Sequence, residues 1–254
     1  MRWIAVTPVR LAKSSTGNLL FGLPKISSFV GFIGSPTFVG LRANMETMPS
    51  VSWDAVIFDY GGVLSYAPQR QDLLDYARSS GLEESTFFQL YAETREYYGR
   101  AAAGYEAHWH RVAKAAGAEI SEAAVKQFIA KESDLWTRPN PEVLALAREI
   151  KAAGRKIAIL SNMTFELLAI LRAKFDWLGE FDVRVWSCEH GCAKPDDSIY
   201  LGCLDALGCT AQRALFFDDR PRNVDGAKQV GIDAHVFESA KQARAIVERG
   251  TDLS

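Results

Sequence analysis

The chain has 254 residues, which is enough for one large domain or for one domain with a sizeable insertion. With 48% hydrophobic and 24% charged residues, its composition is that of an ordinary globular protein and excludes a disordered, collagen-like or polytopic membrane chain. The formal net charge of -2 conceals an asymmetry, because residues 1–45 hold five basic residues and no acid. The remaining 24 basic and 31 acidic residues give the rest of the chain a formal charge of about -7, so it does not offer the cationic surface that nucleic-acid binding needs.

Residues 1–50 are interpreted as an N-terminal extension that is disordered or absent from the native product. Residues 1–45 are rich in Ser, Gly and Phe and contain three prolines that interrupt any regular pattern. The uncharged stretch 26–41 is shorter than the roughly 20 apolar residues of a membrane span, so we expect no membrane association. Three explanations stay open: a translation start placed upstream of Met45 or Met48, a basic targeting leader, or an ordered appendage.

The four cysteines all fall within residues 188–209. The gaps between them hold three, ten and five residues, which differ from the closely paired spacing of structural zinc sites. Ordinary reduced thiols are the favoured interpretation, and they point to a reducing cytoplasm as the location of the protein.

From Trp53 onward, short apolar runs alternate with helical stretches, which is typical of an α/β protein with a parallel sheet. Asn140 and Pro141 predict the cap and first residue of a helix over 141–153, and Gly154 predicts its end. We therefore predict a Rossmann-like doubly wound parallel sheet. Its five strands are expected at 55–58, 156–160, 183–186, 214–217 and 234–237.

Residues 65–138 show no convincing strand and are predicted to form an inserted helical cap. A parallel crossover needs only about a dozen residues, so this stretch is far longer than the connection requires. Glycines separate the amphipathic runs 71–79, 84–98, 105–116 and 122–135, each expected to be a helix. The core domain then consists of residues 51–64 and 139–254, with the cap lying over the ends of its strands.

Polar side chains follow several of the predicted strands. Asp59 follows the first, the pair Ser161 and Asn162 the second, and the pair Asp218 and Asp219 the fourth, while Lys194 lies beyond the third. Each group alone is typical of a turn, a helix cap or a solvated loop. Ligands of open parallel sheets bind at the carboxyl ends of the strands, so together these residues predict one site for a hard cation such as Mg²⁺ and an anion.

Four segments together resemble the ordered motifs of the haloacid dehalogenase-like hydrolase superfamily, especially its helical-cap members related to sugar-phosphate phosphatases. The segments are FDYGGVL (58–64), ILSN (159–162), CEHGCAKPDDSIY (188–200) and FFDDRPRNVDGAKQVGI (216–232). The resemblance covers about residues 53–240 and implies a Mg²⁺-dependent phosphatase for a small phosphorylated metabolite.

The resemblance also implies a role for each matching residue. Asp59 is the nucleophile that forms an aspartyl-phosphate, and Mg²⁺ is bound by Asp59, the backbone oxygen of Gly61 and Asp219, with Asp218 beside them. Ser161, the neighbouring Asn162 amide and Lys194 hold the phosphate. Asn223 orients the loop that carries the acidic pair.

One residue departs from the usual pattern. Family phosphatases place a second Asp, the general acid and base, two residues after the nucleophile, where this chain has Gly61. Losing such a group costs roughly 10²- to 10⁴-fold in rate, although some members similar to sugar-phosphate phosphatases carry a Gly there. Two alternatives therefore stay open: a 2-haloacid dehalogenase using the same Asp, and a weakly catalytic protein that binds phosphate. The acidic pair at 218–219 favours the phosphatase. The sequence contains no dinucleotide-binding glycine motif and no Walker loop, so we expect no organic cofactor.

Overall fold

A computed structural model of the chain describes residues 53–80, 83–89, 91, 110, 114 and 121–250. The N-terminal extension lies outside this range, and so do most residues of the helices predicted at 84–98 and 105–116. Within the first of these, residues 84–89 are helical.

A five-stranded parallel sheet forms the core, in the order β3-β2-β1-β4-β5. In register, Phe58 of the central strand lies between Ile159 and Phe217 of its two neighbours. All five predicted strands are present, although the second and fourth end one residue later than expected and the last begins and ends one residue earlier. The strands are β1 Ala55–Phe58, β2 Lys156–Ser161, β3 Val183–Trp186, β4 Ala214–Asp218 and β5 Asp233–Val236.

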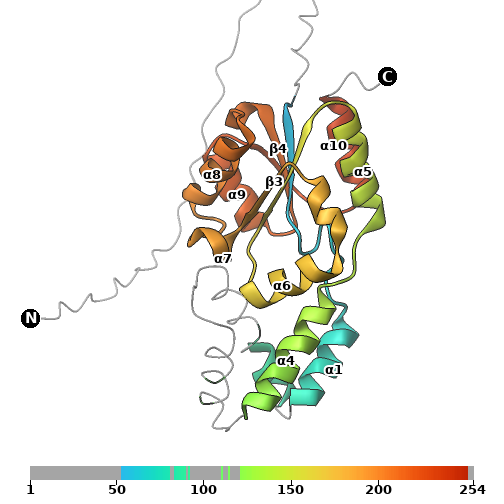
Figure 1. Cartoon of the computed structure of the whole chain (residues 1–254), viewed down its shortest axis with the longest axis vertical. Coiled ribbons are helices and arrows are strands. Elements are labelled where there is room, and N and C mark those ends of the chain that lie inside the picture. The colour runs from blue at the N-terminus through green and yellow to red at the C-terminus, as the bar shows by residue number, and fades with distance from the viewer. Residues whose placement is uncertain are drawn as a thin grey trace, which may run out of the picture. The chain divides into compact units, whose positions relative to one another are not determined.

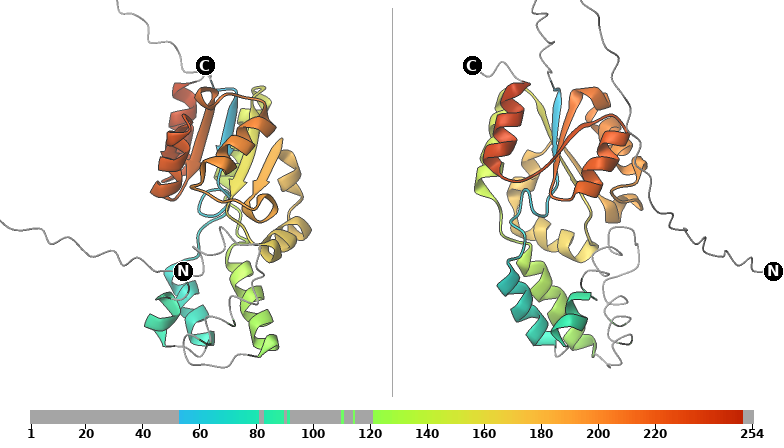
Figure 2. Two further views of the ribbon diagram at one scale, coloured as in Figure 1. Left: turned by 90° about the vertical axis from the view of Figure 1, so that its left-hand side faces the viewer. Right: turned by 180° about the vertical axis from the view of Figure 1, so that it is seen from behind.

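Helices cover both faces of this sheet, as Figures 1 and 2 show. Alternate residues of β1 point to opposite faces: Val56 and Phe58 belong to one buried cluster, whereas Ala55 and Ile57 belong to the other. The first cluster includes α5 (Pro141–Ala152), α6 (Phe165–Lys174) and α10 (Ala240–Arg249). The second includes α8 (Asp197–Leu207) and α9 (Pro221–Gln229). The predicted doubly wound α/β fold is confirmed.

Short helices complete the connections of the core. The loop after β3 contains α7 (Ser187–His190), and two 3₁₀ turns, η1 (Asp176–Glu180) and η2 (Ala211–Arg213), precede β3 and β4. None of the helices that the structure describes is both long and apolar enough to cross a bilayer.

Helix α5 begins where the sequence predicts, and Gly154 lies just beyond its end. The Asn140 side chain accepts a hydrogen bond from the backbone N–H of Val143, and Pro141 takes the first helical position. Gly154, just beyond the helix, has a φ of 81°, a conformation that favours glycine.

The inserted segment contains helices α1 (Arg70–Ser80) and α4 (Glu122–Leu135), which pack against each other beyond the end of the sheet (Figure 1). The chain leaves the core and returns to it at one crossing, where Ser65 and Pro139 form an antiparallel bridge. Hydrogen bonds from Tyr66 N to Arg138 O and from Asn140 N to Leu64 O, both 2.8 Å, hold the two segments together. The C-terminal end of α4 is thereby anchored close to the loop after β1 that begins with Asp59.

Candidate active site

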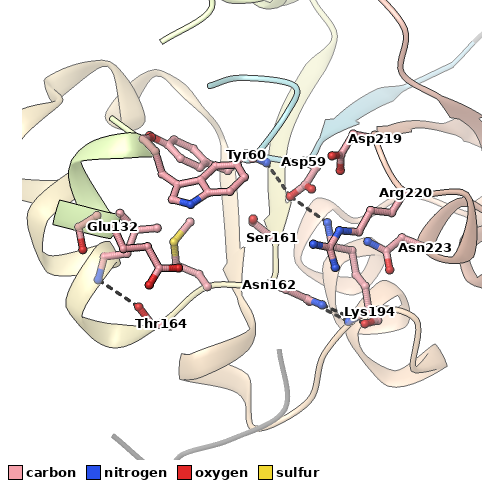
Figure 3. A pocket seen from close by; sticks show the side chains of 15 residues that line it. Asp59, Tyr60, Glu132, Ser161, Asn162, Thr164, Lys194, Asp219, Arg220 and Asn223 are labelled. Carbon is pink, nitrogen blue, oxygen red and sulfur yellow. Dashed lines mark hydrogen bonds and ion pairs between the residues drawn. The ribbon is translucent and has the colours of Figure 1, made fainter. Parts of the chain in front are cut away.

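The carboxyl ends of β1, β2 and β4 meet at a pocket that the last turn of α4 also lines (Figure 3). Asp59 is the first residue after β1, and its backbone N–H donates to Phe217 O at 2.9 Å. Ser161 and Asp218 are the last residues of their strands. Lys194 comes from the loop between α7 and α8, so residues far apart in the sequence meet as the strand-end argument predicts.

Lys194 is a fully buried cation at the centre of this arrangement. Its Nζ lies 2.9 Å from Asp59 Oδ1, 2.6 Å from Asp218 Oδ2 and 2.8 Å from the carbonyl oxygen of Leu160. These contacts use the three donors of an ammonium group. Burial by itself lowers the pKa of Lys194, but the charges of Asp218 and Asp59 outweigh it and raise the pKa above its usual value. Lys194 therefore stays protonated and fixes the orientation of Asp59.

Asp218 is fully buried, and both of its carboxylate oxygens accept hydrogen bonds. Asn223 Nδ2 lies 3.0 Å from each oxygen, and the backbone N–H of Arg220 donates to Oδ1 at 2.9 Å. Together with Lys194, these donors hold the start of α9 against the end of β4. The geometry therefore gives Asp218 and Asn223 a positioning role.

Asp219 completes a group of three carboxylates. Asp59, Asp218 and Asp219 each offer an oxygen within 4.8 Å of the others. Burial, followed by the charges of Asp59 and Asp218, raises the pKa of Asp219 to about 6. Gly62 is required beside it, because its φ is 82° and a Cβ there would lie 2.7 Å from Asp219 Oδ2.

These residues fit a magnesium ion by the chemistry of their donors. Mg²⁺ prefers oxygen ligands, keeps several waters and is bound by one or two carboxylates. Asn223 Oδ1 lines the pocket and is buried without a hydrogen-bond partner among the described residues, so it offers an acceptor for a metal-bound water. Burial first, and then the neighbouring charges of Asp59 and Asp218, raise the pKa of Asp219, and a cation bound among these carboxylates would offset both effects.

The end of β2 forms another side of the pocket. Ser161 is buried and lines the pocket beside Asn162. The Asn162 side chain is engaged elsewhere, because its Oδ1 accepts from Lys194 N and its Nδ2 donates to Lys194 O, both at 2.9 Å. This pair of bonds ties the end of β2 to the loop that carries Lys194.

An aspartate side chain would have little room at position 61, where this chain has a glycine. A Cβ built on Gly61 would lie 3.1 Å from Cζ3 of Trp136, the residue that follows α4. The carbonyl oxygen of Trp136 accepts hydrogen bonds from Tyr60 Oη and Ser65 Oγ, each at 2.8 Å, so the loop after β1 holds the segment that follows α4 at this point. We call these two hydrogen bonds the Trp136 latch.

Eight of the residues that line this pocket have no role in the sequence-based prediction, among them Tyr60, Glu132, Trp136 and Arg220. Arg220 directly follows the acidic pair, and this adjacency was the signal available for it. Glu132 and Trp136 lie within or just after the helix predicted at 122–135, but nothing local in the sequence shows that its last turn faces Asp59. Figure 3 places Arg220 on the Asp59 side of the pocket and Glu132 on the opposite side.

Known proteins resemble this chain in sequence and in fold. The haloacid dehalogenase-like hydrolase family matches residues 53–231. Among curated relatives, a phosphatase of Mycobacterium tuberculosis is 28% identical over 137 residues, which are 54% of this chain and 62% of the relative. A phosphorylated carbohydrates phosphatase of Thermotoga maritima is 28% identical over 218 residues, which are 78% of this chain and 91% of the relative. This chain thus spans less than two thirds of the first relative.

Solved structures share the fold at lower identity. A family enzyme from Bacteroides thetaiotaomicron, solved with magnesium and inorganic phosphate, has a TM-score of 0.59 at 18% identity, covering 80% of this chain and 98% of that chain. An L-2-haloacid dehalogenase has a TM-score of 0.62 at 16% identity, covering 78% of this chain and 99% of that chain. With its family match, fold and strand-end residues in agreement, the chain belongs to the haloacid dehalogenase-like hydrolases.

Proposed function

We propose that the protein is a Mg²⁺-dependent phosphomonoester hydrolase that acts on a small phosphorylated metabolite through an aspartyl-phosphate on Asp59. The observation that carries this proposal is the position of Asp59, at the end of β1, between the ammonium group of Lys194 and the carboxylate of Asp219. A carboxylate held this way is oriented for attack, and phosphoryl transfer depends mainly on positioning and charge stabilisation.

In the first step, Asp59 attacks phosphorus and the bond to the leaving oxygen breaks; in the second, water attacks the aspartyl-phosphate and releases inorganic phosphate. The Ser161 hydroxyl and the backbone N–H of Asn162 are assigned to the phosphate oxygens. The three contacts of Lys194 favour a role in offsetting charge and orienting Asp59, and any direct bond from Lys194 to phosphate stays a prediction.

Asp59, Asp219 and the backbone oxygen of Gly61 are the proposed protein ligands of Mg²⁺, with Asp218 held beside them. When bound, Mg²⁺ supplies positive charge next to the phosphate. We also propose that Arg220, which lines the same pocket, contributes positive charge to the substrate side. Neutralisation matters here because three carboxylates and a phosphate otherwise repel one another.

The dehalogenase alternative is favoured by one observation, the absence of an acid at Gly61. Against it stands the acidic pair, because dehalogenation of a 2-haloacid proceeds without a metal and has no use for clustered carboxylates. The pocket contains Lys194 and Arg220 but surrounds Asp59 with acids, so a phosphatase accounts for more of its residues. The third possibility, phosphate binding without turnover, is an outcome of the test below.

The test is hydrolysis of p-nitrophenyl phosphate and a panel of sugar phosphates, with Mg²⁺ and with EDTA. We expect turnover that needs Mg²⁺ and is lost in Asp59→Asn, a variant that keeps the shape of the side chain. Normal turnover by Asp59→Asn refutes the nucleophile assignment. Chloride release from 2-chloropropionate in EDTA establishes the dehalogenase instead, and phosphate binding without turnover supports the non-catalytic alternative.

A further inference from the structure

The two sides of the pocket differ in their chemistry. Figure 3 shows Asp59, Asp219 and Arg220 on one side and Glu132 and Thr164 on the other. The charged side lies at the carboxyl ends of β1 and β4, where phosphate and metal are proposed to bind. In-line attack by Asp59 directs the leaving group away from the nucleophile, and therefore toward the opposite side, which comes from the end of α4 and the start of α6.

Large apolar side chains form much of this opposite side. Trp136 follows α4, Met163 precedes α6 and Leu167 lies in its first turn, and all three line the pocket. Thr164, between the last two, has a structural task, because its Oγ1 accepts a hydrogen bond from the backbone N–H of Leu167 at 3.2 Å and caps α6. The leaving-group side therefore offers an indole ring, a thioether and an aliphatic side chain.

The ring of Trp136 lies directly against the loop that begins with Asp59. Its atoms Cζ3, Cε3 and Cη2 lie 3.1, 3.4 and 3.9 Å from the place that a Cβ would occupy on Gly61. All three atoms belong to the six-membered ring of the indole, so this ring fills the space that a side chain at position 61 would take. A flat apolar surface therefore begins two residues after the proposed nucleophile.

Contacts within the protein fix this ring in place. The Trp136 latch holds the main-chain carbonyl of the residue through hydrogen bonds from Tyr60 and Ser65. The ring of Tyr60 is in turn stacked on Trp177, with centroids 6.3 Å apart and planes inclined by 6°. Trp136 is only 8% exposed, so most of its surface is already packed. An aromatic surface that is ordered in advance loses little conformational entropy when a ligand binds against it.

We propose that Trp136 determines which esters the site accepts: the leaving group lies against its ring, and the preferred substrates are phosphomonoesters of aromatic alcohols; this rests on the proposed function. Aromatic pairs gain from their ring contact in addition to the burial of apolar surface. A polyol gains less there, because hydroxyl groups lose water against an apolar surface. Glu132 and Ser133 also line this side, but the surface against position 61 is the ring, so the carbon framework next to the ester oxygen meets an apolar group.

The experiment compares benzyl phosphate with glycerol 1-phosphate in wild type, Trp136→Leu and Trp136→Phe. Both esters release primary alcohols of similar basicity, so leaving-group reactivity contributes little to the comparison. We expect wild-type kcat/KM to be about tenfold or more higher for benzyl phosphate. Trp136→Leu should lose most of this preference while its kcat/KM for glycerol 1-phosphate changes by less than about twofold, and Trp136→Phe should keep most of it. Both variants retain the latch, because its hydrogen bonds end on the main-chain carbonyl.

Trp177→Leu is the matched control. Trp177 is a partly buried tryptophan stacked on Tyr60, but it is not among the described residues that line the pocket. Its replacement should change the rates with both esters by the same factor and leave the preference as it is. Binding gives a second readout that needs no turnover: in Asp59→Asn, benzylphosphonate should bind about tenfold more tightly than methylphosphonate, and adding Trp136→Leu should remove most of this difference.

Equal losses on the two esters in Trp136→Leu overturn the proposal, because a residue that only shapes the pocket does not discriminate between leaving groups. A wild-type preference for glycerol 1-phosphate or for sugar phosphates overturns it as well, and so does a loss of preference in Trp177→Leu as large as in Trp136→Leu. Failure of the proposed function is recognised separately: wild-type protein then turns over neither ester, or Asp59→Asn remains active, while the phosphonate comparison still reports whether the ring selects the ligand.

Discussion

Replacing Lys194 by Met tests the electrostatic account of the site, because it removes the buried ammonium and keeps a side chain of similar length. The change leaves the carboxylates of Asp59 and Asp218 buried without the cation that lies 2.9 and 2.6 Å from them. Removing one partner of a buried charge group costs about 3–5 kcal/mol. At about 2–4 °C per kcal/mol for a chain of this size, the melting temperature should fall by roughly 6–20 °C.

Thermal unfolding followed by circular dichroism at pH 7.5 measures this loss, and p-nitrophenyl phosphate hydrolysis should be abolished in the same preparation. Mg²⁺ should narrow the gap from wild type, because a bound cation partly replaces the lost charge. Lys151→Met is the matched control, since Lys151 forms an ion pair with Asp182 at 2.7 Å but its side chain is 43% exposed, and we expect a cost of about 0–1 kcal/mol. If the losses in unfolding free energy of the two variants differ by less than about 1 kcal/mol, the buried cation does not organise this site.

Three further predictions follow from the same geometry. Gly62→Ala should lower the free energy of unfolding by about 1–3 kcal/mol, because alanine is strained at the positive φ of this position. It should also weaken Mg²⁺ activation, because the new methyl group displaces Asp219. Urea unfolding and Mg²⁺ titration measure the two effects, and unchanged Mg²⁺ dependence contradicts the contact. Asp219→Asn should stabilise metal-free protein by about 1–3 kcal/mol at pH 7.5 but not near pH 4. The sign follows from a pKa of about 6 in the folded protein against 3.8 ordinarily: between these values the folded state holds the proton more tightly, so wild-type stability falls as pH rises through this window. Melts in EDTA measure the difference, and parallel pH profiles for the two proteins contradict it. Tyr60→Phe removes one of the two latch bonds and should cost about 0.5–1.5 kcal/mol with little effect on Asp59 itself; a full loss of activity with unchanged stability is the contrary result.

Local sequence patterns were enough to predict the sheet and the residues at its strand ends. Apolar runs such as 55–58 and 214–217 are continuous because parallel strands are buried on both faces, and each is followed directly by an acid. The start of α5 was predictable for a local reason, since Asn140 and Pro141 cap the helix through their own backbone geometry. Asp59, Ser161, Lys194 and the acidic pair were therefore found by position and order.

The contacts that each of these residues makes depend on the tertiary structure and are not encoded in local sequence patterns. Lys194 and Asp218 are equally polar in the sequence, yet burial commits both of them to hydrogen bonds within the core. The space at Gly61 depends on Trp136, 75 residues away, and Glu132 lines the pocket because the Trp136 latch holds the end of α4 beside the loop after β1. Such contacts join segments through packing, which local sequence patterns do not encode, whereas strands and helix caps depend on neighbours a few residues apart.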